Sequence, residues 1–65
     1  MPSSGKEMIK EAEKLGWTTL RVKGSHHQMT HENFDGVYPI ANHTKELAPH
    51  LEKKIYKIIR SVEHE

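Results

Sequence analysis

Two adjacent histidines, His26 and His27, follow a Gly-Ser pair near the middle of the chain. An imidazole exchanges protons near neutral pH, so a histidine held beside a substrate can act as a general acid or base. The backbone N–H groups of a tight Gly-Ser turn can bind a phosphate. A base beside a bound phosphate can remove the proton of a ribose 2′-hydroxyl, which then attacks that phosphate without a metal. The segment from Gly24 to His27 therefore indicates a small nuclease.

Each histidine of this region also has a second interpretation. His27 is either the general base or a half-buried strand histidine, because alternation places it on the same face as the apolar Met29. His26 then points to the opposite face, as a substrate-facing or structural residue. His43 lies near Lys45 in a polar loop, where it is either the acid that protonates the 5′-oxygen leaving group or a solvated loop residue.

Basic residues on both sides of the Gly-Ser pair are candidate partners for phosphate. Arg21 and Lys23 point to the same side of a regular strand, next to the hydroxyl and N–H groups of the turn. Three lysines of the last predicted helix lie off its apolar stripe, where such a face can meet duplex phosphates. For all of these residues the alternative is an ordinary solvated surface. The candidate RNA-binding residues are Arg21, Lys23, Gly24, Ser25, His26, Lys45, Lys53, Lys54 and Lys57.

Length and composition restrict the kind of site that the chain can build. Its 65 residues predict a single domain over 1–65, which is too small to enclose a deep cavity. Because the sequence has no cysteine, it has neither disulfides nor thiolate zinc sites. His27 and His31 share a strand face but lie about 13 Å apart, which is too far to bind one ion. We therefore expect no metal and no other cofactor.

Charge distribution, rather than net charge, favours a nucleic-acid partner. Ten Lys and Arg are nearly matched by nine Asp and Glu, and the net charge of +1 is too small to indicate nucleic-acid binding. Residues 21–31, however, hold Arg21, Lys23 and several histidines without any carboxylate. The middle of the chain is therefore locally cationic.

The sequence also predicts a location. Residues 1–6 lack the apolar run of a signal peptide, and no stretch of about 18 consecutive apolar residues occurs. We therefore expect a cytoplasmic protein that does not contact a membrane.

Two helices can be predicted from capping and periodicity. Ser4 and Glu7 form a capping box before apolar residues at helical spacing, which predicts a helix over 5–15. Pro49 suits the first turn of a second helix. Apolar residues repeated at i, i+4, i+7, i+8 and i+11 extend this helix over 49–62.

Three strands are predicted between these helices. Segments rich in β-branched and aromatic residues place them at 17–22, 26–31 and 37–40. Asn-Phe-Asp-Gly at 33–36 supplies a turn, and Pro39 either makes the third strand an edge or ends it. Short connections in the order α-β-β-β-α predict an α+β fold with a three-stranded antiparallel sheet. Both helices should cover one face of this sheet and leave the other face open.

The apolar positions of these elements give a predicted core. Phe34 is not assigned to it, because it lies in a polar turn, where an exposed ring suggests a partner contact or a lid over the hairpin. The positions of Tyr38 and Tyr56 stay open. The predicted core consists of Met8, Ile9, Leu15, Trp17, Leu20, Val22, Met29, Ile55, Ile58 and Ile59.

Several motifs occur in a fixed order along the chain. They are Gly16-Trp17 after the first helix, Arg21 before Gly-Ser-His-His, Pro39 in the third strand, and His43-x-Lys45-Glu46-Leu47 before the last helix. In this order and spacing the chain resembles the HicA family, the mRNA interferase toxins of HicA–HicB toxin–antitoxin modules. The resemblance covers roughly residues 3–59.

The resemblance implies both a fold and an activity. The fold would be similar to a double-stranded-RNA-binding domain. The activity would be ribonuclease cleavage of mRNA, which arrests translation and growth and is inhibited by a HicB-like antitoxin that covers the active site. The catalytic residue of the family is the histidine that ends the Gly-Ser-x-His motif, which is His27 here. The last helix departs from the family pattern, because it continues through Val62 without a glycine.

Two other functions use the same fold. One is a non-catalytic RNA-binding module that acts as a translational repressor or adaptor. The other is a protein-interaction module that binds no RNA. A nuclease needs the ribose 2′-hydroxyl at the scissile position, whereas an RNA-binding module needs only shape and phosphates. Binding to a protein alone would be indifferent to salt, because phosphate contacts are what weaken steeply as salt rises.

Overall fold

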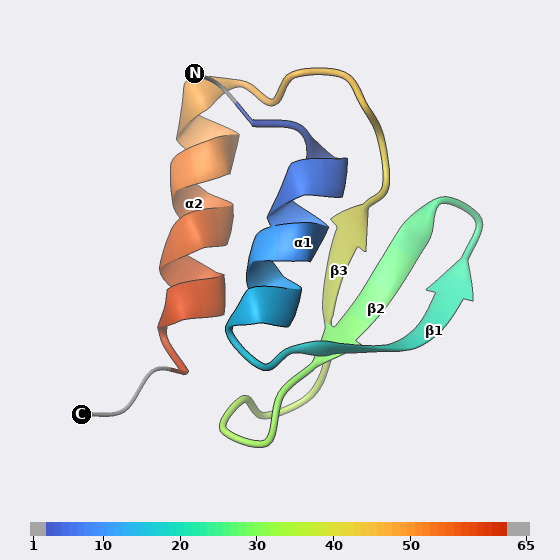
Figure 1. The fold of residues 1–65 in the computed structure, drawn as a ribbon, viewed down its shortest axis with the longest axis vertical. Helices are drawn as coiled ribbons and strands as arrows, with labels where there is room; N and C mark the ends of the chain where they lie inside the picture. The colour runs from blue at the N-terminus through green and yellow to red at the C-terminus, as the bar shows by residue number, and fades with distance from the viewer. Residues whose placement is uncertain (1–2, 63–65) are drawn as a thin grey trace.

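A computed structural model describes residues 3–62 of the chain. The element order along the chain is α-β-β-β-α, as predicted, and each element ends within two residues of its predicted bounds. The strands form one antiparallel sheet in the order β1-β2-β3, and Figure 1 shows the two helices side by side next to it. The predicted α+β architecture is therefore confirmed. The elements are α1 (Gly5–Lys14), β1 (Thr18–Lys23), β2 (His26–Thr30), β3 (Tyr38–Ala41) and α2 (Pro49–Arg60).

The first helix begins at the predicted capping box. The Ser4 hydroxyl accepts a hydrogen bond from the Glu7 N–H at 3.2 Å, and the Ser4 N–H donates to the Glu7 carboxylate at 3.0 Å. These two bonds satisfy backbone donors that a helix start otherwise leaves unpaired. The apolar face of α1 then buries Met8, Ile9 and Ala12.

A single core joins both helices to one face of the sheet. Met29 of β2 and Ile40 of β3 are buried on that face, together with the buried residues of α1 and Ile59 of α2. Buried Trp17 packs into the same cluster, and its indole N–H donates to the Ile59 carbonyl at 3.0 Å. Because both helices contribute to this cluster, both cover the same sheet face and leave the opposite face open.

Two residues of β1 that were predicted to lie in the core are exposed instead. Leu20 is 61% exposed and Val22 is 54% exposed. The register shifts between Thr19, which pairs with Met29, and Arg21, which pairs with Gln28, so Leu20 is an extra residue in a β-bulge. Val22 lies toward the tip of the β1–β2 hairpin, which extends away from the helices in Figure 1, and no element covers it there.

Phe34 was expected to be exposed, but it packs against the core. Its ring centroid lies 4.8 Å from that of Trp17 and 6.4 Å from that of Tyr38, and the ring is half-buried. The expectation of a free ring for a partner is therefore wrong. Three predicted core residues, Leu15, Ile55 and Ile58, are only partly buried at the edge of the cluster. Within the described part of the chain, no helix is long and apolar enough to cross a membrane.

Candidate functional site

The Gly-Ser pair forms the turn of the β1–β2 hairpin. Lys23 pairs with His26, so only Gly24 and Ser25 lie between the strands. Gly24 has a φ of 62° in the left-handed region, and a glycine there as the first of two central residues is typical of a type II′ hairpin turn. Gly24 and Ser25 are exposed, at the end of the hairpin that projects from the helices in Figure 1.

His27 lies on the middle strand and faces the helix side of the sheet. It pairs with Val22 of β1 and Ile40 of β3, and it is half-buried on the face that carries buried Met29. The Oγ1 of Thr19 lies 3.2 Å from the Nδ1 of His27. Among residues 3–62, no hydrogen bond reaches the Nε2 of His27. The ring is therefore held at one nitrogen and free at the other.

The bulge in β1 decides which side chains share this face with His27. In a regular register after Thr19, Arg21 would pair with His27 and point to the same face. The extra residue Leu20 moves that pairing by one position, so Val22 faces His27 and Arg21 pairs with Gln28. The bulge therefore places an aliphatic side chain rather than a cation opposite the imidazole.

The predicted phosphate partners near the hairpin lie on the open face of the sheet. Arg21 and Lys23 share that face, as alternation predicted, because they pair with Gln28 and His26. They line a shallow pocket of about 320 Å³ that also includes exposed apolar side chains. His27 is on the opposite face of the sheet. The pocket is lined by Leu20, Arg21, Lys23, Gln28 and Val37.

The loop after β3 brings His43 to the hairpin turn. The Nε2 of His43 lies 3.1 Å from the Oγ of Ser25, and the Asn42 N–H donates to the Ser25 carbonyl at 2.7 Å. Both His43 and Ser25 are exposed. The structure therefore joins two residues that the sequence placed 18 positions apart.

The N-terminal segment holds this loop in place, although no motif in the sequence predicts the contact. The Lys6 N–H donates to the His43 carbonyl at 3.0 Å, and the Leu47 N–H donates to the Ser3 carbonyl at 2.9 Å. Ser4 and Glu46 form an isolated antiparallel bridge between these bonds. The loop is thus fixed at both ends by backbone contacts that leave no periodic signal in the sequence.

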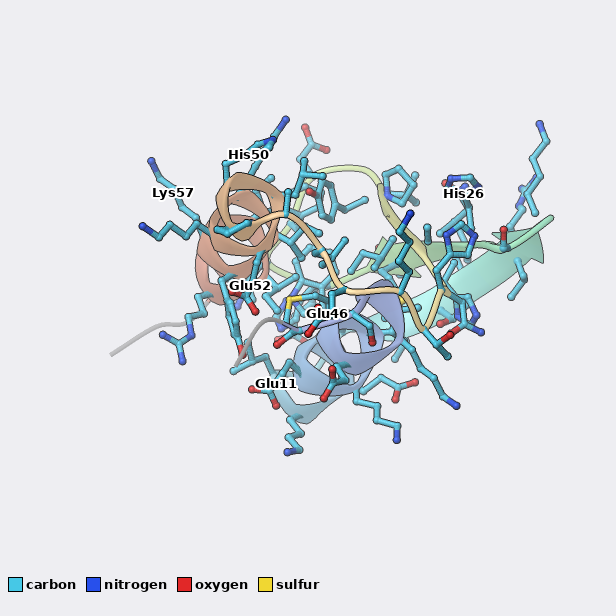
Figure 2. All side chains as sticks on the ribbon, turned by 90° about the horizontal axis from the view of Figure 1, so that it is seen from above. Glu11, His26, Glu46, His50, Glu52 and Lys57 are labelled. Carbon is cyan, nitrogen blue, oxygen red and sulfur yellow. The ribbon has the colours of Figure 1, made fainter. Side chains whose placement is uncertain are left out.

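The remaining predicted RNA-binding residues do not join the hairpin. Lys53, Lys54 and Lys57 are exposed on α2, and Figure 2 shows Lys57 on the opposite side of the molecule from His26. Lys45 is exposed in the loop between β3 and α2. Any RNA that contacted both the hairpin and the α2 lysines would have to extend across the molecule, whose longest dimension is 29 Å.

His31 has a structural role in the neighbouring turn. Its Nδ1 accepts a hydrogen bond from the Asn33 N–H at 2.9 Å, so its Nε2–H donates to the Leu15 carbonyl at 3.1 Å. Both ring nitrogens are therefore used to hold this turn to the end of α1. Among residues 3–62, no three His, Asp or Glu side chains are close enough to hold a metal ion.

Comparison with protein families identifies one that fits this arrangement. The chain matches the family described as the HicA toxin of bacterial toxin–antitoxin systems over residues 5–60. That range includes both helices and all strands of the sheet. No curated protein matches the chain.

Proposed function

This chain belongs to the HicA family of bacterial toxin–antitoxin toxins, and we propose that it is a metal-independent endoribonuclease that cleaves mRNA in the cytoplasm and so arrests translation and growth. The observation that supports this activity most directly is His27, whose Nδ1 is held by Thr19 while its Nε2 has no partner among residues 3–62. A nitrogen fixed in direction and open to a substrate is what a general base requires.

The cleavage would proceed by transfer within the RNA. The Nε2 of His27 takes the proton of the ribose 2′-hydroxyl, and the resulting oxygen attacks the adjacent phosphorus. The bond from phosphorus to the 5′-oxygen breaks, which leaves a 2′,3′-cyclic phosphate and a 5′-hydroxyl. His43 is the candidate acid that protonates the leaving oxygen, since its loop lies against Ser25 of the turn. The N–H groups of Gly24 and Ser25, with Lys23 and Arg21, are the proposed phosphate contacts.

We also propose how the toxin is restrained. A toxin of this family is paired with an antitoxin, and Gly24 and Ser25 of the hairpin turn stay exposed beside the loop that carries His43. A HicB-like antitoxin would inhibit cleavage by covering the hairpin turn and the loop that carries His43.

Replacing His27 by Ala tests the proposed base. We expect the H27A protein to lose RNA cleavage and growth arrest while keeping its far-UV circular dichroism, because the ring is only half-buried and fills no deep part of the core. The matched control is H50A, which removes an exposed histidine from α2. Growth arrest by a folded H27A protein equal to that of the wild type would exclude His27 as the base.

The same assay addresses the metal and the alternative function. Cleavage by the wild type should persist in excess EDTA, because the described residues bring no three ligand-type side chains together. An RNA with a 2′-deoxyribose at the scissile position should bind but stay intact, because it lacks the nucleophile. Binding without cleavage of either RNA would instead indicate the non-catalytic module on the same fold.

A further inference from the structure

We propose that Thr19 is a positioning residue that fixes the tautomer of His27, with the proton on Nδ1 and the lone pair on Nε2. This inference rests on the proposed role of His27 as the base. Two contacts of a single hydroxyl carry it. The Oγ1 of Thr19 lies 3.2 Å from the Nδ1 of His27 and donates a hydrogen bond to the Sδ of Met29 at 3.1 Å.

The chemistry of these three groups decides the direction of each bond. A threonine hydroxyl has one proton to donate, and a thioether sulfur can only accept. When the Thr19 proton points to Met29, its oxygen can only accept from His27, so the Nδ1 of His27 must carry a proton. A neutral imidazole with Nδ1 protonated has its lone pair on Nε2. Nε2 is the nitrogen that the proposed mechanism uses.

The opposite arrangement makes fewer hydrogen bonds. If Thr19 donated to Nδ1 instead, the sulfur of Met29 would lose its donor, and Met29 is fully buried on this face. The proton of His27 would then lie on Nε2, and this nitrogen could not accept the proton of a 2′-hydroxyl. The arrangement with Nδ1 protonated therefore makes more hydrogen bonds, and it is also the one in which Nε2 can act as the proposed base.

The bulge in β1 keeps a cation away from this contact, because it places Val22 rather than Arg21 opposite His27. Thr19 pairs with Met29 directly, and the extra residue that follows it lets Val22 pair with His27. Thr19 is thus diagonal to His27 on the same face, with no larger polar side chain between them. At this position the Thr19 hydroxyl contacts both His27 and Met29, which lie on the same face of β2.

Nitrogen-15 NMR of the histidine rings tests the proposal without reference to activity. At about pH 8.5, where imidazoles are generally neutral, the wild-type spectrum should show His27 protonated at Nδ1. In Thr19→Val, which keeps the shape but removes the hydroxyl, this preference should be lost. Thr19→Ser restores a hydroxyl and should restore the wild-type tautomer. A wild-type ring protonated at Nε2, or a tautomer unchanged in T19V, would overturn the proposal.

Met29→Leu provides a second variant with a distinct outcome. It keeps Thr19 and roughly the volume of the core side chain but removes the sulfur acceptor. The hydroxyl is then free to donate to Nδ1, so the ring should shift toward protonation at Nε2. If the M29L ring stayed protonated at Nδ1, the relay from Met29 through Thr19 would be refuted.

RNA cleavage then separates this proposal from the proposed function. Both T19V and M29L should lower the cleavage rate, by about tenfold or more for a lost orienting partner, whereas T19S should stay near the wild type. Altered tautomers with unchanged cleavage would refute Thr19 as a positioning residue. Failure of the base itself would be recognised separately, by a folded H27A protein that still cleaves RNA.

Discussion

At the scale of single residues, His27 occupies the boundary between a packed core and an open hairpin. Toward the helices its strand face continues into fully buried Met29, and toward the turn its cross-strand neighbour Val22 is exposed. The core side fixes the ring through Thr19, and the hairpin side leaves room for a substrate. The proposed role of His27 as a base needs both properties, since a fully buried imidazole is inaccessible and a fully exposed one is not oriented.

Alternation alone predicted some of this site from the sequence. It placed His27 with Met29 and His26 on the opposite face, because that prediction requires only that β2 is regular. It could not identify Thr19, because strict alternation with Leu20 and Val22 in the core puts Thr19 on the other face. The bulge at Leu20 brings Thr19 and Val22 to one face instead. The exposure of Leu20 was missed for the same reason, since both residues look like ordinary members of an alternating strand.

Tyr38, on the same sheet face, supplies a prediction about pH. Burial raises the pKa of the Tyr38 phenol above its ordinary value of about 10. The native state then holds the phenolic proton more tightly than the unfolded state does. The resulting stability is fully present below about pH 10 and is lost as pH rises through the raised pKa. The free energy of unfolding of Tyr38→Phe should therefore fall less than that of the wild type as pH rises past about 10.

Urea denaturation at neutral and alkaline pH measures this difference. The two proteins differ only in the Tyr38 hydroxyl, so the comparison between them isolates the phenol. Equal losses of stability in both proteins would mean that burial does not affect the Tyr38 phenol.

At the scale of elements, the site depends on how the start of α1 meets the end of β3. Gly5, the first residue of α1, lies so close to the Ala41 carbonyl oxygen that a side chain there would overlap it. This approach lets the N-terminal segment bond to the loop that carries His43. The helices themselves could be predicted from caps and periodicity, which are local signals. The junction could not, because it joins segments distant in sequence.

Gly5→Ala distinguishes helix propensity from this contact. Propensity alone predicts that the free energy of unfolding rises by up to about 1 kcal/mol, because alanine has a higher helix propensity than glycine. Overlap with the Ala41 carbonyl predicts a net loss of about 1–3 kcal/mol instead, as in other overpacked sites. The urea midpoint should therefore fall. RNA cleavage should fall with it, since the loop has to move.

Gly36→Ala is the matched control for this substitution. Gly36 has a φ of 92° with open space around it, so an added side chain strains only the backbone. Its loss of stability should leave the specific activity of the folded protein unchanged. A G5A protein with a higher urea midpoint than the wild type would show that α1 can move away from β3 without loss of stability.

At the scale of the whole molecule, the hairpin carries cations alone, whereas the helices carry charges of both signs. The hairpin carries Arg21 and Lys23 without a carboxylate in residues 21–31, whereas Glu11, Glu46 and Glu52 gather near the helices in Figure 2. The overall charge of +1 conceals this asymmetry. An antitoxin that covers the hairpin would thus meet a locally cationic surface, and an acidic partner surface would associate with it fastest.

Lys23→Glu tests that expectation in the complex of toxin and antitoxin. The substitution should slow association several-fold at low salt, and the difference should shrink as salt rises and screens both charges. Stopped-flow mixing of the two purified proteins measures the rate. Lys10→Glu makes the same charge change on α1, in a groove that it shares with Tyr56, and should alter the rate much less. Equal effects of both substitutions would place the antitoxin elsewhere.

The hydrogen bond from Trp17 to Ile59 has a consequence for the order of events during synthesis. It joins residues 42 positions apart, and Ile59 completes the core beneath the sheet. A hairpin alone is at best marginally stable in water. The segment with His27 leaves the ribosome before α2 does, so a nascent chain exposes the residues of the site before they can be held in position. The core that positions the proposed site is therefore incomplete until α2 has emerged from the ribosome.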